Sequence, residues 1–189
     1  MRKQVEDAPL RFFFEHRKRI EEWYALGEAA TALTSELLLE AGRTMVPPED
    51  AKTHVELDEG GYSSVVLYRQ TWWDKARSKP AAGVGFGWGR QPDIERPSAS
   101  GGPWYGLWRG DTGKNDPIPD RLREACKSTL DDLGLRPSTR WTWFPRWDVM
   151  PPAEAGWYND LPGWADTTTR LVLNLFELTA DHIEEVVAG

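Results

Sequence analysis

The stretch AAGVGFGWGR, residues 81–90, alternates glycine with aliphatic and aromatic side chains. Val84, Phe86 and Trp88 share one face, and the positions between and around them are Gly83, Gly85, Gly87 and Gly89. This period of two predicts a β-strand with one apolar face and one face without side chains. Because glycine weakens a strand, several glycines on one face indicate that another group approaches the backbone closely there.

Four other segments have the composition of strands. Residues 53–58 (THVELD) alternate apolar and polar side chains, as expected for a strand with one solvated face. Residues 62–73 (YSSVVLYRQTWW) are β-branched and aromatic, which predicts a central strand buried on both faces. Residues 104–109 (WYGLWR) and 139–149 (TRWTWFPRWDV) are expected to form a fourth and a fifth strand.

Helical periodicity covers residues 9–42 and 164–187, and a shorter helix is expected over 120–134. The predicted order is helix, four strands, helix, strand, helix. We therefore expect one α+β domain over residues 1–189, with a mainly antiparallel sheet of four or five strands. The two long terminal helices are expected to pack together over one face of this sheet.

The bulk composition excludes several classes of protein. A net charge of −7 and an isoelectric point near 5.1 oppose a broad nucleic-acid-binding surface, which requires clustered basic residues. The single cysteine, Cys126, permits no intramolecular disulfide and no four-thiolate zinc site. No apolar run reaches the ~20 residues of a membrane span, and a cytoplasmic protein without a cofactor or metal is expected.

Eleven tryptophans are an unusual number for 189 residues, and several are expected next to the glycine strand. One interpretation is internal packing, in which indole rings cover backbone that has no side chains of its own. The alternative is a flat binding surface for a planar ligand or an aromatic side chain of a partner. The candidate binding residues, besides Gly83, Gly85 and Gly87, are Trp104, Trp108, Arg109, Arg140, Trp141, Trp143, Arg146 and Trp147.

Tryptophan and arginine dominate binding hot spots, so the function that we expect is non-catalytic binding. The partner would be a protein or a small planar ligand, and a homo-oligomer is a further possibility. No Gly-x-Ser-x-Gly elbow and no dinucleotide or P-loop fingerprint occurs in the sequence.

The alternative function is that of a metal-dependent hydrolase or nuclease. His54, Glu56 and Asp58 share one face of the predicted strand, and imidazole with carboxylates is a possible metal-ligand set. The same pattern also fits the solvated face of an edge strand. The coarse order of helix, three strands, helix and strand resembles the core of the restriction-endonuclease-like superfamily, and Asp58 would correspond to the Asp of that core. That resemblance implies a Glu-x-Lys pair on the third strand, where this chain has Gly-Phe-Gly-Trp-Gly-Arg, with its nearest carboxylates at Asp93 and Glu95.

The first predicted helix begins with RFFFEHRKRIEEW, residues 11–23. Three consecutive phenylalanines cannot all lie on one helical stripe, so part of this segment is expected to be either a docking surface or an ordinary solvated face. Its basic residues, on an acidic protein, would suit an acidic partner or a short nucleic-acid element.

Overall fold

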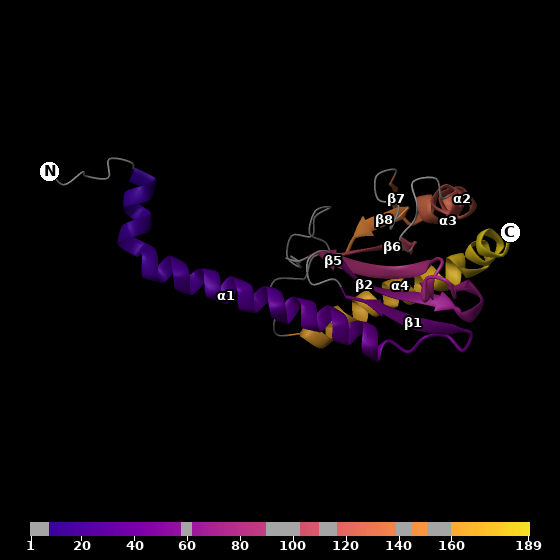
Figure 1. Cartoon of the computed structure of the whole chain (residues 1–189), viewed down its shortest axis with the longest axis horizontal. Coiled ribbons are helices and arrows are strands. Elements are labelled where there is room, and N and C mark those ends of the chain that lie inside the picture. The colour runs from indigo at the N-terminus through magenta and orange to yellow at the C-terminus, as the bar shows by residue number, and fades with distance from the viewer. Residues whose placement is uncertain (1–7, 58–61, 90–102, 110–116, 139–144, 151–159) are drawn as a thin grey trace.

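The structure is a computed structural model that describes residues 8–57, 62–89, 103–109, 117–138, 145–150 and 160–189. Its centre is a six-stranded antiparallel sheet in the order β1-β2-β5-β6-β8-β7 (Figure 1). The strands of this sheet are β1 (Ala51–Glu56), β2 (Tyr62–Arg69), β5 (Gly83–Gly89), β6 (Trp104–Trp108), β7 (Arg136–Pro137) and β8 (Arg146–Val149). A separate hairpin consists of β3 (Trp73–Asp74) and β4 (Lys79–Pro80), after a short 3₁₀ turn, η1 (Gln70–Trp72).

The helices are α1 (Ala8–Thr44), α2 (Ile118–Ala125), α3 (Lys127–Asp132) and α4 (Leu161–Ala188). The α+β class, the antiparallel sheet and the two long terminal helices are as expected. The sheet has one strand more than expected, because the two-residue strand β7 pairs with β8. The helix expected over 120–134 is divided into α2 and α3 at Cys126. Of the strand expected over 139–149, the structure describes only the C-terminal end, which forms β8.

The middle of the sheet consists of β2 and β5. Residues 64–68 of β2 and all of β5 are buried, as a central position with cover on both faces requires. The strand β5 covers the glycine-alternating stretch, and its register pairs Val65 with Phe86 and Val66 with Gly85. Val65 therefore lies on the same face of the sheet as Phe86, and Val66 lies on the same face as Gly85.

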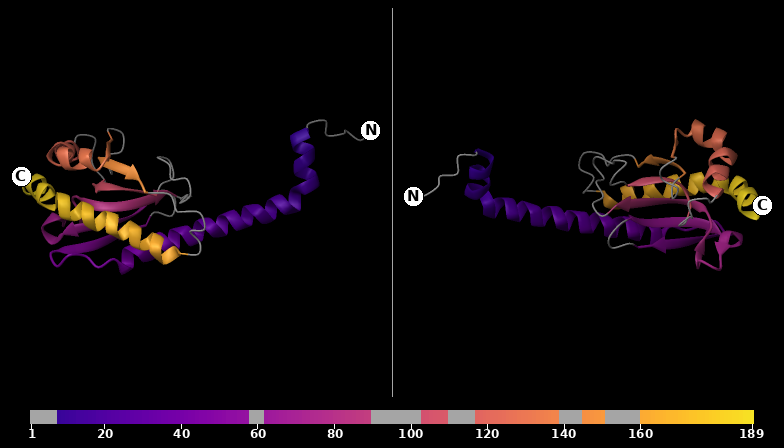
Figure 2. Two further views of the ribbon diagram at one scale, coloured as in Figure 1. Left: turned by 180° about the vertical axis from the view of Figure 1, so that it is seen from behind. Right: turned by 45° about the horizontal axis from the view of Figure 1, so that its top comes forward.

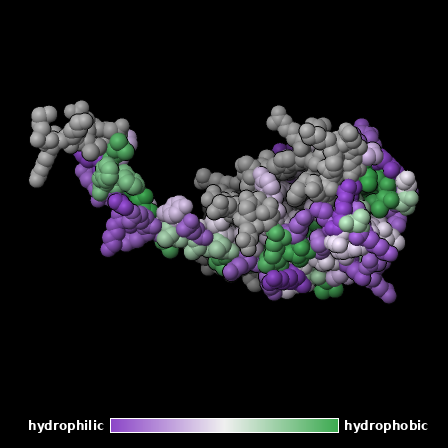
Figure 3. Space-filling model, in the orientation of Figure 1, coloured by the Kyte–Doolittle hydropathy of each residue, from purple (hydrophilic) through white to green (hydrophobic). Residues whose placement is uncertain are grey.

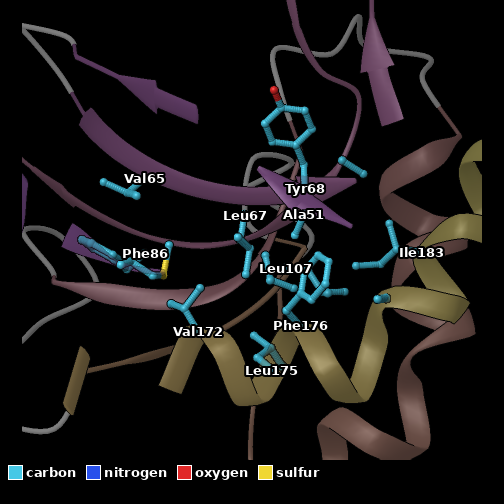
Figure 4. Close-up of a cluster of buried hydrophobic side chains, with 14 of the residues drawn as sticks. Ala51, Val65, Leu67, Tyr68, Phe86, Leu107, Val172, Leu175, Phe176 and Ile183 are labelled. Atoms are coloured by element: carbon cyan, nitrogen blue, oxygen red, sulfur yellow. The ribbon is translucent and has the colours of Figure 1, made fainter. Parts of the chain in front are cut away.

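The main core lies between the sheet and α4, whose N-cap is Asp160. Figure 4 shows Val172, Leu175 and Phe176 of α4 directed toward the side chains of the sheet. Leu67 and Phe86 meet them from the sheet, and all five side chains are at most 3% exposed. The stripe that faces the sheet recurs at three- and four-residue steps, as the sequence predicts for this helix.

The first helix packs on this body only through its C-terminal part. Leu38 is fully buried and Ala41 is 2% exposed, and α1 contacts α4 and β1. Gly42 lies against β2, where a Cβ atom would come within 2.5 Å of Val65 Cγ2. The rest of α1, which has 37 residues in all, projects away from the sheet (Figures 1 and 2). The two terminal helices thus meet near the end of α1 and do not cover the sheet side by side.

Candidate functional site

The glycine face of β5 adjoins two of the candidate tryptophans. The β5–β6 register places Trp108 opposite Gly83 and Trp104 opposite Gly87, so each indole is a cross-strand neighbour of a glycine. Trp104 is 2% exposed and Trp108 is fully buried, and with Val66 they form a second hydrophobic cluster apart from the main core. Neither ring presents an open face to a ligand, and aromatic side chains beside strand glycines compensate for the missing packing.

Two of the glycines are also required by the approach of the neighbouring strand. A Cβ atom on Gly83 would lie 2.6 Å from the Leu67 carbonyl oxygen. A Cβ atom on Gly85 would contact the Val65 carbonyl oxygen at a distance that real Cβ atoms do not reach. The groups that approach these glycines most closely therefore belong to β2: the backbone at both positions, and also the Val66 side chain at Gly83.

Two of the three candidate arginines serve internal contacts. Arg109 is 3% exposed, and its guanidinium donates a hydrogen bond to the Ala81 carbonyl oxygen. Arg146 is 4% exposed, forms an ion pair with Asp131 and donates to the Leu135 carbonyl oxygen at 3.3 Å. Both guanidinium groups stabilise the body of the protein. The remaining candidates, Arg140, Trp141 and Trp143, lie outside the described residues.

Trp147 is the described candidate indole that stays half-exposed. Its ring centroid lies 4.6 Å from the guanidinium carbon of Arg136, whose Nη2 donates a 2.6 Å hydrogen bond to Asp148. Arg136 was not among the candidates, because β7 is too short for the sequence to show that it pairs with β8. Trp147 is therefore the accessible member of the described tryptophan and arginine candidates, and Arg136 adds a contact that was not among them.

Two of the three candidate metal ligands, His54 and Glu56, lie on the edge strand β1. His54 and Glu56 share one face, and a Glu56 carboxylate oxygen lies 3.5 Å from Lys79 Nζ. The His54 ring meets Trp73 edge-on, with centroids 5.8 Å apart. Asp58 and the acidic residues Asp93 and Glu95 lie outside the described residues. Within the part of the chain that the structure describes, no group of three His, Cys, Asp or Glu side chains could hold a metal ion.

The β3–β4 hairpin determines the electrostatics of this face. Burial lowers the pKa of His54; the Glu56 carboxylate raises this pKa, and the Lys79 ammonium lowers it further. The imidazole is therefore neutral at pH 7, and the ammonium of Lys79 opposes a metal cation beside Glu56. These contacts were not predicted, since Trp73 and Lys79 come from strands of two residues, which are too short for a periodic pattern.

The largest exposed apolar surface of the described residues lies on the projecting part of α1. Figure 3 shows hydrophobic side chains along this segment, away from the body of the protein. Trp23 is 59% exposed, and the other large exposed side chains of α1 are Leu10, Phe12, Phe13, Phe14, Tyr24, Leu26 and Leu33. Large exposed apolar side chains gathered on one segment favour an interaction site over an ordinary solvated face.

Part of this surface continues the buried face of the same helix. At 100° per residue, the face that holds Leu38 and Ala41 also holds a series of residues further toward the N-terminus. We call this series the α1 stripe; its members are Phe12, Phe13, His16, Ile20, Trp23, Gly27 and Ala30. Along the stripe, Phe12 and His16 have ring centroids 4.4 Å apart. This side of α1 is thus buried at its C-terminal end and mostly exposed further toward the N-terminus, where the helix bends sharply (Figures 1 and 2).

Charged residues occupy the flanks and the back of the projecting segment. Arg17 donates a 2.6 Å hydrogen bond to Glu21, and Arg11 lies 3.6 Å from Glu15. The guanidinium carbon of Arg19 lies 4.7 Å from the centroid of Trp23. Opposite charges one turn apart, as in Arg17 and Glu21, favour the helical conformation of this exposed segment. Exposed apolar side chains lie beside these charges as well, since Phe14 is on the side of the helix opposite Trp23, and the projecting segment therefore carries large apolar side chains on more than one face.

Comparisons of the chain with protein-family models, with curated proteins and with solved structures find no match. Among the described residues, no helix combines the length and the apolar character that crossing a membrane requires.

Proposed function

We propose that this chain is a non-catalytic binding protein that docks on a partner protein through the α1 stripe. The observation that carries this proposal is the open continuation of a buried helix face. Trp23 and Phe13 on the stripe are 59% and 40% exposed, whereas Leu38 on the same face is fully buried. Isolated helices are marginal in water, and helices gain most of their stability from packing of an amphipathic face. A partner would supply that packing along the projecting segment.

We also propose a smaller, secondary contact at the tryptophan and arginine surface that the sequence predicts over the glycine strand. Its accessible side chains are Trp147 and Arg136, because Trp104 and Trp108 are buried. The metal-dependent alternative depends on Asp58 and on carboxylates of residues 91–96. Those residues lie outside the described ranges, so the described structure adds no support to that alternative.

Photo-crosslinking at adjacent positions tests the docking function. Ala29 and Ala30 are both exposed, but only Ala30 lies on the stripe. A photoreactive amino acid at position 30 of the full chain, in the cells that make it, is expected to give a protein adduct. The same group at position 29, on the charged back of the helix, is the matched control and is expected to give little.

Two results would contradict the proposal. The first is the absence of an adduct at position 30, or equal labelling at both positions. The second is an adduct with lipid alone, since a basic amphipathic helix can also lie in a membrane interface. Far-UV circular dichroism of both variants confirms that α1 is retained.

A further inference from the structure

The first turns of α1 carry aromatic side chains on several sides of the helix. Phe12, Phe13 and Phe14 are consecutive, so at 100° per residue they point to three different sides. They are 58%, 40% and 59% exposed, and this end of α1 is bent away from the rest of the helix, far from the sheet (Figures 1 and 2). The described part of the protein therefore leaves all three sides open. A helix that is apolar on all sides is normally buried on all sides.

Basic side chains follow the phenylalanines in the same arrangement. Arg17, Lys18 and Arg19 are consecutive, so they also point to three sides of the helix. Residues 11–19 hold four basic side chains and one carboxylate, although the net charge of the whole chain is −7. Lys18 is exposed and has no ion pair within the ranges that the structure describes. Positive charge thus surrounds the helix one to two turns after the aromatic side chains.

We propose that these turns of α1 bind in a groove of the partner protein that is apolar around Phe12–Phe14 and lined with carboxylates around Arg17–Arg19. This proposal rests on the proposed docking function and states the chemistry of the partner's site. A flat surface covers one side of a helix and would leave at least one of the three phenylalanines in water. Seven residues precede α1 in the sequence, so the groove is open at the end where the chain enters it.

The carboxylates near the basic residues favour a protein groove over a nucleic acid. Glu15, Glu21 and Glu22 lie within about one turn of Arg17–Arg19. Each would repel a phosphate backbone, whose negative charge is uniform along its length. A protein groove can place carboxylates opposite the basic side chains and apolar groups opposite the phenylalanines, and such complementary charge also speeds association. The partner that fits α1 is therefore an acidic protein.

Truncation of Phe14 tests whether the partner encloses the helix. The probe is the protein that becomes joined to position 30 in the crosslinking experiment, once it has been purified. Phe14 lies on the side of α1 opposite Trp23, so a partner that contacts only the side of Trp23 does not touch it. Phe14→Ala in the full chain is expected to raise the dissociation constant at least about 30-fold, as measured by isothermal titration calorimetry.

The matched control for this truncation lies on the body of the protein. Leu178 of α4 is 44% exposed, and Leu178→Ala is expected to leave the dissociation constant within about twofold. A Phe14→Ala chain that binds within about twofold of the wild type, with α1 retained by far-UV circular dichroism, would refute the enclosing groove.

Charge reversal tests the acidic lining. Lys18→Glu and Lys75→Glu make the same change of charge at exposed positions, and Lys75 lies between β3 and β4, away from α1. Lys18→Glu is expected to raise the dissociation constant about tenfold and to weaken its dependence on salt, whereas Lys75→Glu stays within about twofold. Lys18→Arg keeps the charge and is expected to bind as the wild type does. Equal effects of the two reversals would show a general effect of net charge and would overturn the acidic lining.

The proposed function and this proposal fail in different ways. A protein that is joined to position 30 but binds Phe14→Ala and Lys18→Glu as tightly as the wild type overturns the groove and leaves the docking function standing. The absence of any protein adduct at position 30 overturns both. A photoreactive amino acid at position 14 is expected to join the same protein as position 30 does. An adduct there with RNA, with lipid or with a second copy of this chain overturns the acidic groove.

Discussion

Gly42 lies where α1 meets β2, and replacing it with alanine tests that contact. A Cβ atom on Gly42 would lie 2.5 Å from Val65 Cγ2 and 2.6 Å from Val65 Cγ1. Val65 is fully buried and its β-branched side chain has few rotamers, so α1 or the strand must shift. Overpacking of this kind costs about 1–3 kcal/mol, and alanine returns about 0.5–1 kcal/mol of helix propensity. We expect Gly42→Ala to lower the free energy of unfolding by about 1 kcal/mol.

A double-mutant cycle isolates the steric part of this cost. Val65→Ala alone removes buried methyl groups and is expected to cost about 2 kcal/mol. In the Val65→Ala background, the new Cβ atom fills part of the space, so Gly42→Ala should stabilise the protein. The coupling energy between positions 42 and 65, from urea denaturation of the four proteins, is expected to be about 2 kcal/mol.

Gly27→Ala, compared at a protein concentration at which the chain is monomeric, is the control on the same helix. Nothing lies within 4 Å of a Cβ atom there, so the substitution gains helix propensity without a clash in the single chain. We expect slower amide exchange around position 27 and no loss of unfolding free energy. If Gly42→Ala stabilises the protein as Gly27→Ala does, or if the cycle shows additive changes, the contact between α1 and β2 is not as close as the structure has it.

Three further predictions concern the body of the protein. Burial raises the pKa of the Cys126 thiol to about 12. A thiol reagent at pH 8 should therefore react with Cys126 only after denaturation, and rapid reaction of the native protein would refute this. Burial lowers the folded-state pKa of His54 below its ordinary 6.5, so the unfolded chain binds more protons just below that pH. As the pH is lowered below about 6.5, the free energy of unfolding should therefore decrease more steeply for the wild type than for His54→Gln. Urea denaturation at several pH values measures this, and equal slopes for the two proteins would contradict the prediction. Asp160 Oδ1 accepts a 3.0 Å hydrogen bond from the Gly163 amide at the start of α4, so Asp160→Ala should cost about 1 kcal/mol of unfolding free energy, while Asp160→Asn should cost less.

The sequence predicted those elements whose side chains repeat over many residues. The alternation of residues 83–89 gave the strand β5, and the unbroken apolar run of β2 gave its central position. Both long helices follow from their apolar stripes. By contrast, β3, β4 and β7 have two residues each, which is too few for any period to show. The break at Cys126 has no proline or glycine beside it, so nothing local announces it.

The candidate binding residues were harder to predict, because burial depends on partners far away in the sequence. Arg146 is buried through Asp131 and the Leu135 carbonyl, which lie 15 and 11 residues away. Trp108 is buried through a register that places it beside Gly83. Residue type alone indicated that tryptophan and arginine were available for binding. It did not indicate which of them the body of the protein itself would use.

The same reasoning explains why α1 has to be judged from the structure. Apolar side chains recur at three- and four-residue steps from Phe13 to Ala41, which predicts a helix with an apolar face but does not show how much of that face is covered. The body of the protein offers α4 and β1 as cover only to the last part of the helix. On this side of α1 the buried part holds Leu38 and Ala41, and the exposed part holds Phe13 and Trp23 among smaller and polar residues. Aromatic side chains give a large contact area for little conformational entropy, which favours an interface formed between molecules over one formed within a chain.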